Sequence, residues 1–289
     1  MRKCVRGLCL LAVSTAVLIV AGAASADATV HVTPATTQWT QDDTTAGGAV
    51  SWSGAVGAPT TTTLGSSALE LTTDASTTAK ADLFNHSIAG MPLADLETLG
   101  YWTYQRAATS FAGGDASFQL QLLVNGTSGF TTLVYEPYNG DPANGTVLPG
   151  AWQHWDVSAG QFWSTRTTPD SGLQAGGGGA PFYTLAQVQG LYPNAVVVGV
   201  GVNVGSNNRG YDIAVDGVQV NDTLYDFESE GCDTSTSGTT ITLLGDCTET
   251  APFTVPDGFT LDGAGHTLTA ADPDAARSSA QLFRAAARQ

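Results

Sequence analysis

The sequence has few of the residues that build long helices. It contains two methionines, six glutamates and, beyond residue 26, a single lysine, Lys80. Threonine is abundant instead, and 34 of the 289 residues are glycine. This composition favours strands joined by tight turns over helices. The isolated lysine also excludes a glycine-rich loop that would hold a nucleotide phosphate with the help of a lysine.

Motifs of the common hydrolases are absent. None of the four histidines occurs in a metal-binding spacing such as HExxH. No Gly-x-Ser-x-Gly nucleophile elbow occurs, and Asp216 alone cannot supply the six or more oxygens of a calcium site. Glu228 and Glu230 could share a strand face, but we interpret them as solvated linker acids rather than as the paired carboxylates of a glycosidase. The sequence therefore predicts no catalytic residue, no metal and no cofactor.

Basic residues are also scarce, and the formal net charge is −16. Residues 1–26 hold three basic and no acidic residues, so 7 Lys and Arg remain beyond them against 26 Asp and Glu, a formal charge of −19. Such a surface repels phosphate groups and anionic lipids. Nucleic acid and membrane surfaces are therefore excluded as partners, and the oligomeric state stays open.

The first 26 residues have the features of an export signal. A basic start at residues 2–6 precedes an apolar run at 8–24, which ends in the small residues Ala24-Ser25-Ala26. The alternative is an uncleaved membrane anchor, since a run of about 20 residues can span a bilayer. Because Ser, Thr and Gly dilute the run, we expect a signal peptide at 1–26 and a secreted, extracellular protein.

Cysteine usage agrees with export. Cys232 and Cys247 are the two cysteines beyond the leader, and an even pair in an exported protein is expected to form a disulfide. A bridge that closes so short a loop could stabilise the fold by about 3 kcal/mol. Zinc would need two further ligands, and no histidine lies near enough in sequence to indicate them.

Apolar residues recur at every second position in several segments, which is the pattern of half-buried strands. The clearest cases are 117–124, where Phe118, Leu120 and Leu122 share a face, and 196–204, where Val198, Val200, Val202 and Val204 alternate with glycine and asparagine. Further strands are expected at 29–33, 68–73, 99–105, 131–136, 152–157, 213–220 and 224–228, with a bulge at Gly217 and one brief helix at 184–192.

About ten strands with almost no helix predict two packed antiparallel sheets, an all-β sandwich of the jelly-roll type. Residues 162–181, which include four consecutive glycines, interrupt this rhythm and are expected to form a mobile loop. From residue 240 onward the pattern changes to three-residue apolar-polar-apolar segments, several of them followed by Asp-Gly turns. Strands this short suit a solenoid, in which each strand stacks on the equivalent strand of the next coil.

Residues 240–270 (TITLLGDCTETAPFTVPDGFTLDGAGHTLTA) resemble the opening coils of a right-handed parallel β-helix of the pectin-lyase-like fold, in the version found in exported actinobacterial proteins. The preceding part, including VVVGVGVNVGSNNRGYDIAVDGVQVN at 196–221, resembles carbohydrate-binding jelly-roll modules placed before such helices. The resemblance implies a β-sandwich at 27–230, the first coil or coils of a β-helix at 231–273 and an irregular or short helical tail at 274–289.

The expected β-helix is incomplete. A β-helix needs at least three stacked repeats to bury its core, and this segment holds little more than one coil. Two explanations stay open. Either the reading frame is lost near Asp274, or the tail forms a short amphipathic helix that caps the coil.

Aromatic and amide side chains on the outer face of the sandwich are the binding candidates, because sugar rings dock on aromatic faces with the help of planar polar groups. Trp102 and Trp152 are expected in the core. Trp163, beside the glycine-rich loop, is expected to be exposed, and Gly199 and Gly201 should leave room above the outer face. The candidate residues are Trp163, Gln119, Gln121, Asn203, Asn207, Arg209 and Tyr211. The alternative for each is a merely solvated sheet face.

The favoured interpretation is a secreted, non-catalytic recognition module for carbohydrate, such as a cell-wall or other cell-surface polysaccharide. One alternative is a truncated fragment of a β-helix polysaccharide lyase or hydrolase. The other is a structural surface protein without a small ligand.

Overall fold

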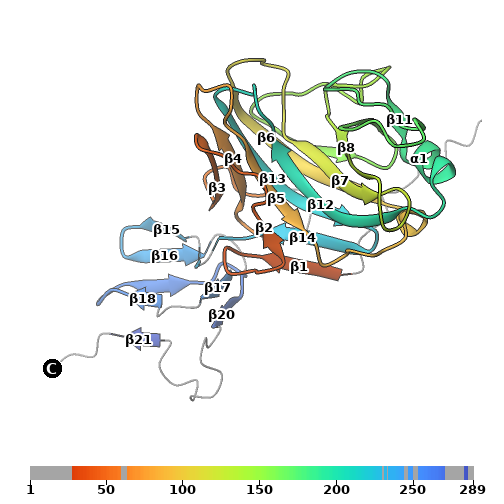
Figure 1. Ribbon diagram of the computed structural model, residues 1–289. Coiled ribbons are helices and arrows are strands. Elements are labelled where there is room, and N and C mark those ends of the chain that lie inside the picture. Colours follow the sequence, from red (N-terminus) through yellow and green to blue (C-terminus); the bar gives the residue numbers. More distant parts are fainter. Residues whose placement is uncertain are drawn as a thin grey trace, which may run out of the picture.

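The computed structural model describes residues 28–59, 64–229, 231–232, 234–243, 247–249, 253–270 and 283–285. The expected signal peptide, Glu230 and most of the expected tail lie outside these residues. The described part contains two seven-stranded sheets packed face to face, one short α-helix and three small sheets (Figure 1). The predicted β-sandwich is therefore confirmed, whereas its jelly-roll topology and the β-helix stay predictions.

The first sheet is built around the long strand β13 (Tyr211–Val220). Its other strands are β3 (Gly48–Ser53), β4 (Ala68–Thr73), β14 (Thr223–Phe227), β1 (Ala28–Val32), β6 (Leu99–Ala108) and β9 (Trp152–Asp156). All pairs are antiparallel except β1 and β14, which run parallel. The bulge predicted at Gly217 is confirmed, since this residue has a φ of +53° where the register against β6 shifts.

The second sheet is antiparallel throughout. In spatial order its strands are β11 (Tyr183–Thr184), β10 (Gln161–Ser164), β8 (Phe130–Tyr135), β7 (Ser117–Leu123), β12 (Val196–Val204), β5 (Ala81–Asn85) and β2 (Trp39–Thr40). Strict alternation fails at one point, because a bulge between Val197 and Gly199 turns Val197 inward and leaves Val198 half-buried.

The core lies between the two sheets. Tyr101 of β6 packs on Phe118 and Tyr135 of the opposite sheet, with ring centroids 5.7 and 6.2 Å apart, and Tyr135 packs on Phe162 at 6.0 Å. All four rings are buried. Each large apolar side chain buried in this way stabilises the fold by about 1.5–3 kcal/mol.

The prediction that Trp102 and Trp152 are core residues is wrong. Tyr101 and Thr103 point inward on β6, so Trp102 between them points outward, where it packs on His154 of β9 with centroids 5.1 Å apart. Trp152 is likewise half-buried on this outer face and packs on Tyr104.

Helix α1 (Leu185–Leu191) matches the helix predicted at 184–192. It begins with a capping box, in which Thr184 Oγ1 accepts from the backbone N–H of Gln187 and the Gln187 side chain accepts from that of Thr184. The region predicted as a loop at 162–181 begins differently, since its first three residues complete β10. Among the described residues, no helix has the length and apolar character needed to cross a bilayer.

Seven short strands follow the sandwich and lie beside the β1–β14 edge of the first sheet (Figure 1). They are β15 (Thr234–Ser237), β16 (Thr240–Leu243), β17 (Cys247–Glu249), β18 (Phe253–Val255), β19 (Thr260–Asp262), β20 (Leu268–Ala270) and β21 (Phe283–Ala285). Strands β16 and β19, β17 and β20, and β18 and β21 pair in parallel. The described part of the predicted tail, β21, is thus extended and not helical.

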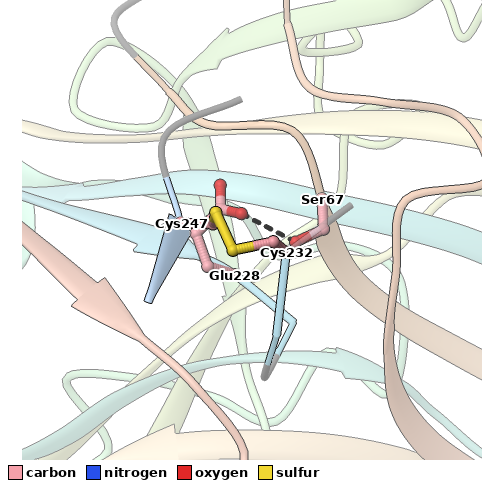
Figure 2. Close-up of a disulfide and its surroundings, with 4 residues drawn as sticks. All are labelled: Ser67, Glu228, Cys232 and Cys247. Atoms are coloured by element: carbon pink, nitrogen blue, oxygen red, sulfur yellow. Dashed lines mark hydrogen bonds between the residues drawn. A yellow bond between two sulfur atoms is a disulfide. The ribbon is translucent and has the colours of Figure 1, made fainter. Parts of the chain in front are cut away.

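The predicted disulfide between Cys232 and Cys247 is confirmed, with Cα atoms 5.1 Å apart. It ties β17 to the chain just after the sandwich. Figure 2 shows the bridge beside Glu228, whose Oε2 accepts a hydrogen bond of 2.8 Å from Ser67 Oγ. Glu228 is only 8% exposed and also accepts from the backbone N–H of Ser66 at 3.0 Å. The interpretation of Glu228 as a solvated linker acid is therefore wrong.

Candidate functional site

A groove of about 680 Å³ crosses the outer face of the second sheet. Its floor consists of outward side chains of β10, β8, β7, β12 and β5, and its walls are loops that precede or follow these strands and β2. Five of the seven predicted site residues line it, namely Trp163, Gln119, Gln121, Asn203 and Asn207. The structure thus brings these five together, while their role in binding stays a prediction.

One cross-strand row forms the middle of the floor. Trp163 on β10 pairs with Val134 on β8, and Val134 pairs with Gln119 on β7. Gln119 pairs in turn with Gly201 on β12, and Gly201 pairs with Phe84 on β5. Because neighbouring strands lie about 4.8 Å apart, this row spans about 19 Å. The floor is therefore long enough to contact an extended chain across the strands.

The expectation that Gly199 and Gly201 leave open space is wrong. A Cβ atom on Gly201 would lie 2.5 Å from Phe84 Cδ1, and one on Gly199 would lie 2.6 Å from His86 Nδ1. The ring of Phe84, on the neighbouring strand β5, thus covers Gly201, and the ring of His86, just after β5, covers Gly199. Phe84 is only 3% exposed, so it supports the floor and Trp163 offers the aromatic surface.

Polar side chains flank the middle row on both sides. Gln121 on β7 pairs with Thr132 on β8 and with Gly199 on β12. Ser117 pairs with Asn203, and Gln119 Nε2 donates to Ser117 Oγ at 3.3 Å. The floor therefore presents amide and hydroxyl groups, which can both donate and accept hydrogen bonds.

Glu136, which the sequence analysis missed, fixes the position of Trp163. Its Oε2 accepts from Trp163 Nε1 at 3.0 Å and from Asn139 Nδ2 at 2.8 Å. Its Oε1 accepts from the hydroxyl of Tyr138 at 2.7 Å, and Asn139 Nδ2 also donates to the carbonyl of Gly178 in the glycine-rich loop. The indole is thus held in place before any ligand arrives, which lowers the entropy lost on binding.

The groove is strongly acidic. Its carboxylates are Asp42, Asp43, Asp82, Asp115 and Glu136. Lys80 is the single basic side chain among the described residues of the lining, and it forms an ion pair with Asp43. The groove therefore has a negative potential that no unpaired lining cation offsets.

Two of these acids are structural. Burial raises the pKa of Asp115 to about 7, while hydrogen bonds from Thr103 Oγ1 at 2.6 Å and from the backbone N–H of Ala116 at 2.8 Å oppose the shift. Burial also raises the pKa of Asp82, which accepts from the backbone N–H groups of Asp42 and Asp43. Asp82 therefore organises the loop after β2, whereas Asp115 joins the start of β7 to β6 of the other sheet.

Two predicted site residues lie outside the groove. Arg209 is exposed in the turn after β12 but does not line the groove. The prediction for Tyr211 is wrong, because its side chain points into the core like Ile213 and Val215 and is 1% exposed. The alternation along β13 carried this signal, since Tyr211 is in phase with those two apolar residues.

A smaller cavity of about 280 Å³ lies between the sandwich and the seven short strands. His31, Glu228, Cys247 and Thr267 are among its lining residues. Across the described part of the chain, no three or more His, Cys, Asp or Glu side chains are arranged to hold a metal ion.

No protein-family model matches the chain, and no curated protein matches it. Among solved structures, the chain is similar to a family 11 carbohydrate-binding module from Clostridium thermocellum in complex with a β-1,3-1,4-mixed-linked tetrasaccharide, with 13% identity over 66% of this chain and 91% of that chain and a TM-score of 0.36. It is also similar to the family 11 module of the cellulosomal cellulase Lic26A-Cel5E of Clostridium thermocellum, with 12% identity over 67% and 90% of the two chains and a TM-score of 0.36. Both similarities are weak. The strand pairing of the chain establishes the sandwich, and the lining residues define the groove.

Proposed function

We propose that this chain is a secreted, non-catalytic module that binds a polysaccharide in the groove of the second sheet. The observation that carries the proposal is the row from Trp163 to Phe84, with a fixed indole at one end and the Gln119 amide in its middle. An aromatic face and planar polar groups are what a pyranose ring needs, because the ring has apolar C–H faces and hydroxyl edges.

The charge of the groove disfavours an acidic polysaccharide, and we propose a neutral one as the ligand. Asp42, Asp43 and Glu136 line it with Asp82 and Asp115, against the paired Lys80. A polymer of uronic acids would bring further negative charge into this field and would be repelled. Hydroxyl groups of a neutral sugar can instead donate hydrogen bonds to the carboxylates.

The arrangement of the acids favours binding without cleavage. Glycoside hydrolysis uses two carboxyl groups that flank the scissile bond. Asp82 is buried and accepts hydrogen bonds from the loop after β2, and Asp115 is buried and accepts one from Thr103 of β6. Glu136 already accepts three hydrogen bonds. Asp43 forms an ion pair with Lys80, and Asp42 lies 2.9 Å from His86 Nε2. These contacts support a binding role and leave the groove acids without a free, paired arrangement.

Export and a β-helix start belong to the same proposal. The Cys232–Cys247 disulfide supports folding in an oxidising compartment, in line with the signal peptide expected at residues 1–26. The successive parallel pairs β16–β19 and β17–β20 support the view that residues 231–273 begin a solenoid.

Affinity electrophoresis in gels that contain mixed-linkage β-glucan, xylan or glucomannan tests the proposal. We expect at least one of these neutral polymers to retard the protein. Trp163→Ala should weaken retention about tenfold, which corresponds to about 1.4 kcal/mol for one lost stacking contact. The matched control is Trp102→Ala, because Trp102 is also half-buried but lies on the outer face of the other sheet.

Two outcomes would contradict the proposal. Migration unaffected by every polysaccharide would favour a structural surface protein. Release of reducing ends or unsaturated sugars by the purified protein would favour the fragment of a lyase or hydrolase.

A further inference from the structure

The loop between β6 and β7 exposes an aromatic ring close to the groove. Phe111 is 51% exposed, one of the few large apolar side chains on the described surface. A single exposed apolar residue is ordinary on a protein surface. Two features distinguish Phe111 from such a residue. Buried side chains hold the backbone of its loop, and its ring packs on Tyr138, which is hydrogen-bonded to the groove residue Glu136.

Two core residues hold the Phe111 loop. The hydroxyl of Tyr211 donates to the carbonyl of Phe111 at 3.3 Å. Gln105 Nε2 donates to the carbonyl of Ala112 at 2.9 Å and to that of Gly114. Because Tyr211 and Gln105 are 1% and 3% exposed, rigid parts of the sandwich determine where the loop lies.

The ring itself rests on its own loop. A Cβ atom on Gly113 would lie 2.9 Å from Phe111 Cζ and within 3.5 Å of two further ring atoms. The glycine thus allows the ring to pack against the loop backbone, which leaves the remaining ring surface open to solvent.

Phe111 is connected to the groove through one tyrosine. Its ring lies 5.3 Å from that of Tyr138 in an edge-to-face arrangement. The hydroxyl of Tyr138 donates to Glu136 Oε1, and Glu136 Oε2 accepts from Trp163 Nε1. One carboxylate therefore joins the groove tryptophan to an aromatic pair that lies beyond the strand ends.

We infer that Phe111 and Tyr138 form an aromatic wall that contacts a sugar unit of the polysaccharide bound in the groove. This inference rests on the proposed function and adds a second contact region to it. The exposed ring surface offers an apolar face on which a pyranose ring can stack. Because the loop is already held in place, little conformational entropy is lost when the sugar binds. The wall lies to the side of the Trp163 row, so only a chain long enough to leave that row can reach it.

Isothermal titration calorimetry with oligosaccharides of two to eight units tests the inference. The series is prepared from whichever of mixed-linkage β-glucan, xylan or glucomannan retards the wild-type protein. We expect Phe111→Ala to weaken binding of the longest oligosaccharides about fivefold to tenfold and to leave the shortest unchanged. Phe111→Tyr, which keeps the ring, should retain the affinity of the wild type.

Leu191→Ala is the control, because Leu191 is 48% exposed on α1 and does not line the groove. Both substituted side chains are exposed, so an unchanged melting temperature confirms that the variants are folded. Equal affinity of Phe111→Ala and wild type at every length, with binding still lost in Trp163→Ala, would overturn the inference and leave the proposed function intact. Absence of binding by the wild-type protein would overturn both.

Discussion

At the scale of single residues, the floor of the groove depends on Gly201, which has no side chain. Gly201 gives the ring of Phe84 a place against the sheet, with the carbonyl of Leu83 on the same side. A glycine inside a strand usually weakens it, and it is tolerated where another group approaches closely. Here the approaching group is the aromatic ring of the directly paired residue, which fills the space above the glycine.

Gly201→Ala should therefore destabilise the protein. The added methyl would lie 2.5 Å from Phe84 Cδ1 and 2.6 Å from the carbonyl oxygen of Leu83, and the backbone atom cannot move away cheaply. Overpacking of this kind costs about 1–3 kcal/mol. Denaturation in urea measures the free energy of unfolding of the variant against the wild type.

Gly190→Ala is the matched control. It places a methyl where no heavy atom lies within 4 Å, inside a helix. Alanine is preferred over glycine in a helix by about 1 kcal/mol, so this variant should be at least as stable as the wild type. Equal stability changes at positions 190 and 201 would contradict the packing described for Phe84.

At the scale of elements, alternation predicted nine strands of the sandwich and missed the other five, β2, β3, β5, β10 and β11. Strands β4 and β12 were predicted with the bounds observed, and β7 to within one residue. Strand β5 was missed because all five of its residues are buried, so its sequence shows no alternation. Strand β10 was missed because Phe162 and Trp163 are adjacent and apolar, although one points to the core and the other to the groove.

The same limit applies to the candidate site. Gln119, Gln121 and Asn203 could be found because they alternate with core residues on predicted strands. Glu136 ends the strand predicted at 131–136 and is in phase with Thr132 and Val134, so alternation carried a signal for it that was overlooked. Phe111 could not be found, since it lies in the loop between β6 and β7 and only the folded chain shows which loops approach the groove. Their positions depend on long-range contacts, such as Tyr211 with Phe111, that no local pattern reports.

Strand β14 brings an acidic cluster to one end of the first sheet. Burial raises the pKa of Asp216 well above its usual range, and the negative charge of Asp226 adds to the effect. Burial likewise raises the pKa of Glu228 from 4.5 to about 8, again with the charge of Asp226 adding. His31 lies 3.0 Å from Asp226 on the adjacent strand β1. The folded protein therefore holds protons here that the unfolded chain releases.

Stability should consequently fall as the pH rises from about 4.5 to about 8, because over this window the folded state binds more protons than the unfolded state. Glu228→Gln removes one of the titrating groups. Calorimetry at pH 5 and pH 8.5 should show a smaller drop in melting temperature for this variant than for the wild type.

The comparison of Glu228→Gln with the wild type isolates Glu228 together with its effect on the pKa of Asp216. Burial lowers the pKa of His154, which acts in the opposite direction, but His154 is present in both proteins. Identical drops in melting temperature would contradict the role assigned to Glu228.

At the scale of the whole molecule, the net charge of the chain has the same sign as the charge of the groove. The chain has a formal net charge of −16, and five acids line the groove against one paired lysine. The field of the molecule therefore reinforces that of the site and repels anionic polymers before they make contact.

We expect polygalacturonate to cause no retardation in affinity electrophoresis at about 10 mM salt, where charges act over about 30 Å. Retention by a neutral polysaccharide should change less than about twofold when salt rises to about 1 M, since screening affects only charged partners. Tighter retention by polygalacturonate than by any neutral polymer would contradict the ligand class proposed here.

The parallel pairing of β1 with β14 has a consequence for how a neighbouring domain could be attached. The chain enters the sandwich at Ala28 and leaves it at Phe227, which lie at opposite ends of two adjacent parallel strands, each about 13 Å long. Both strands belong to the sheet on the opposite side from the groove. A domain attached at either point would lie beside this edge, away from the face that carries Trp163, which would stay free to lie flat on a large, insoluble target.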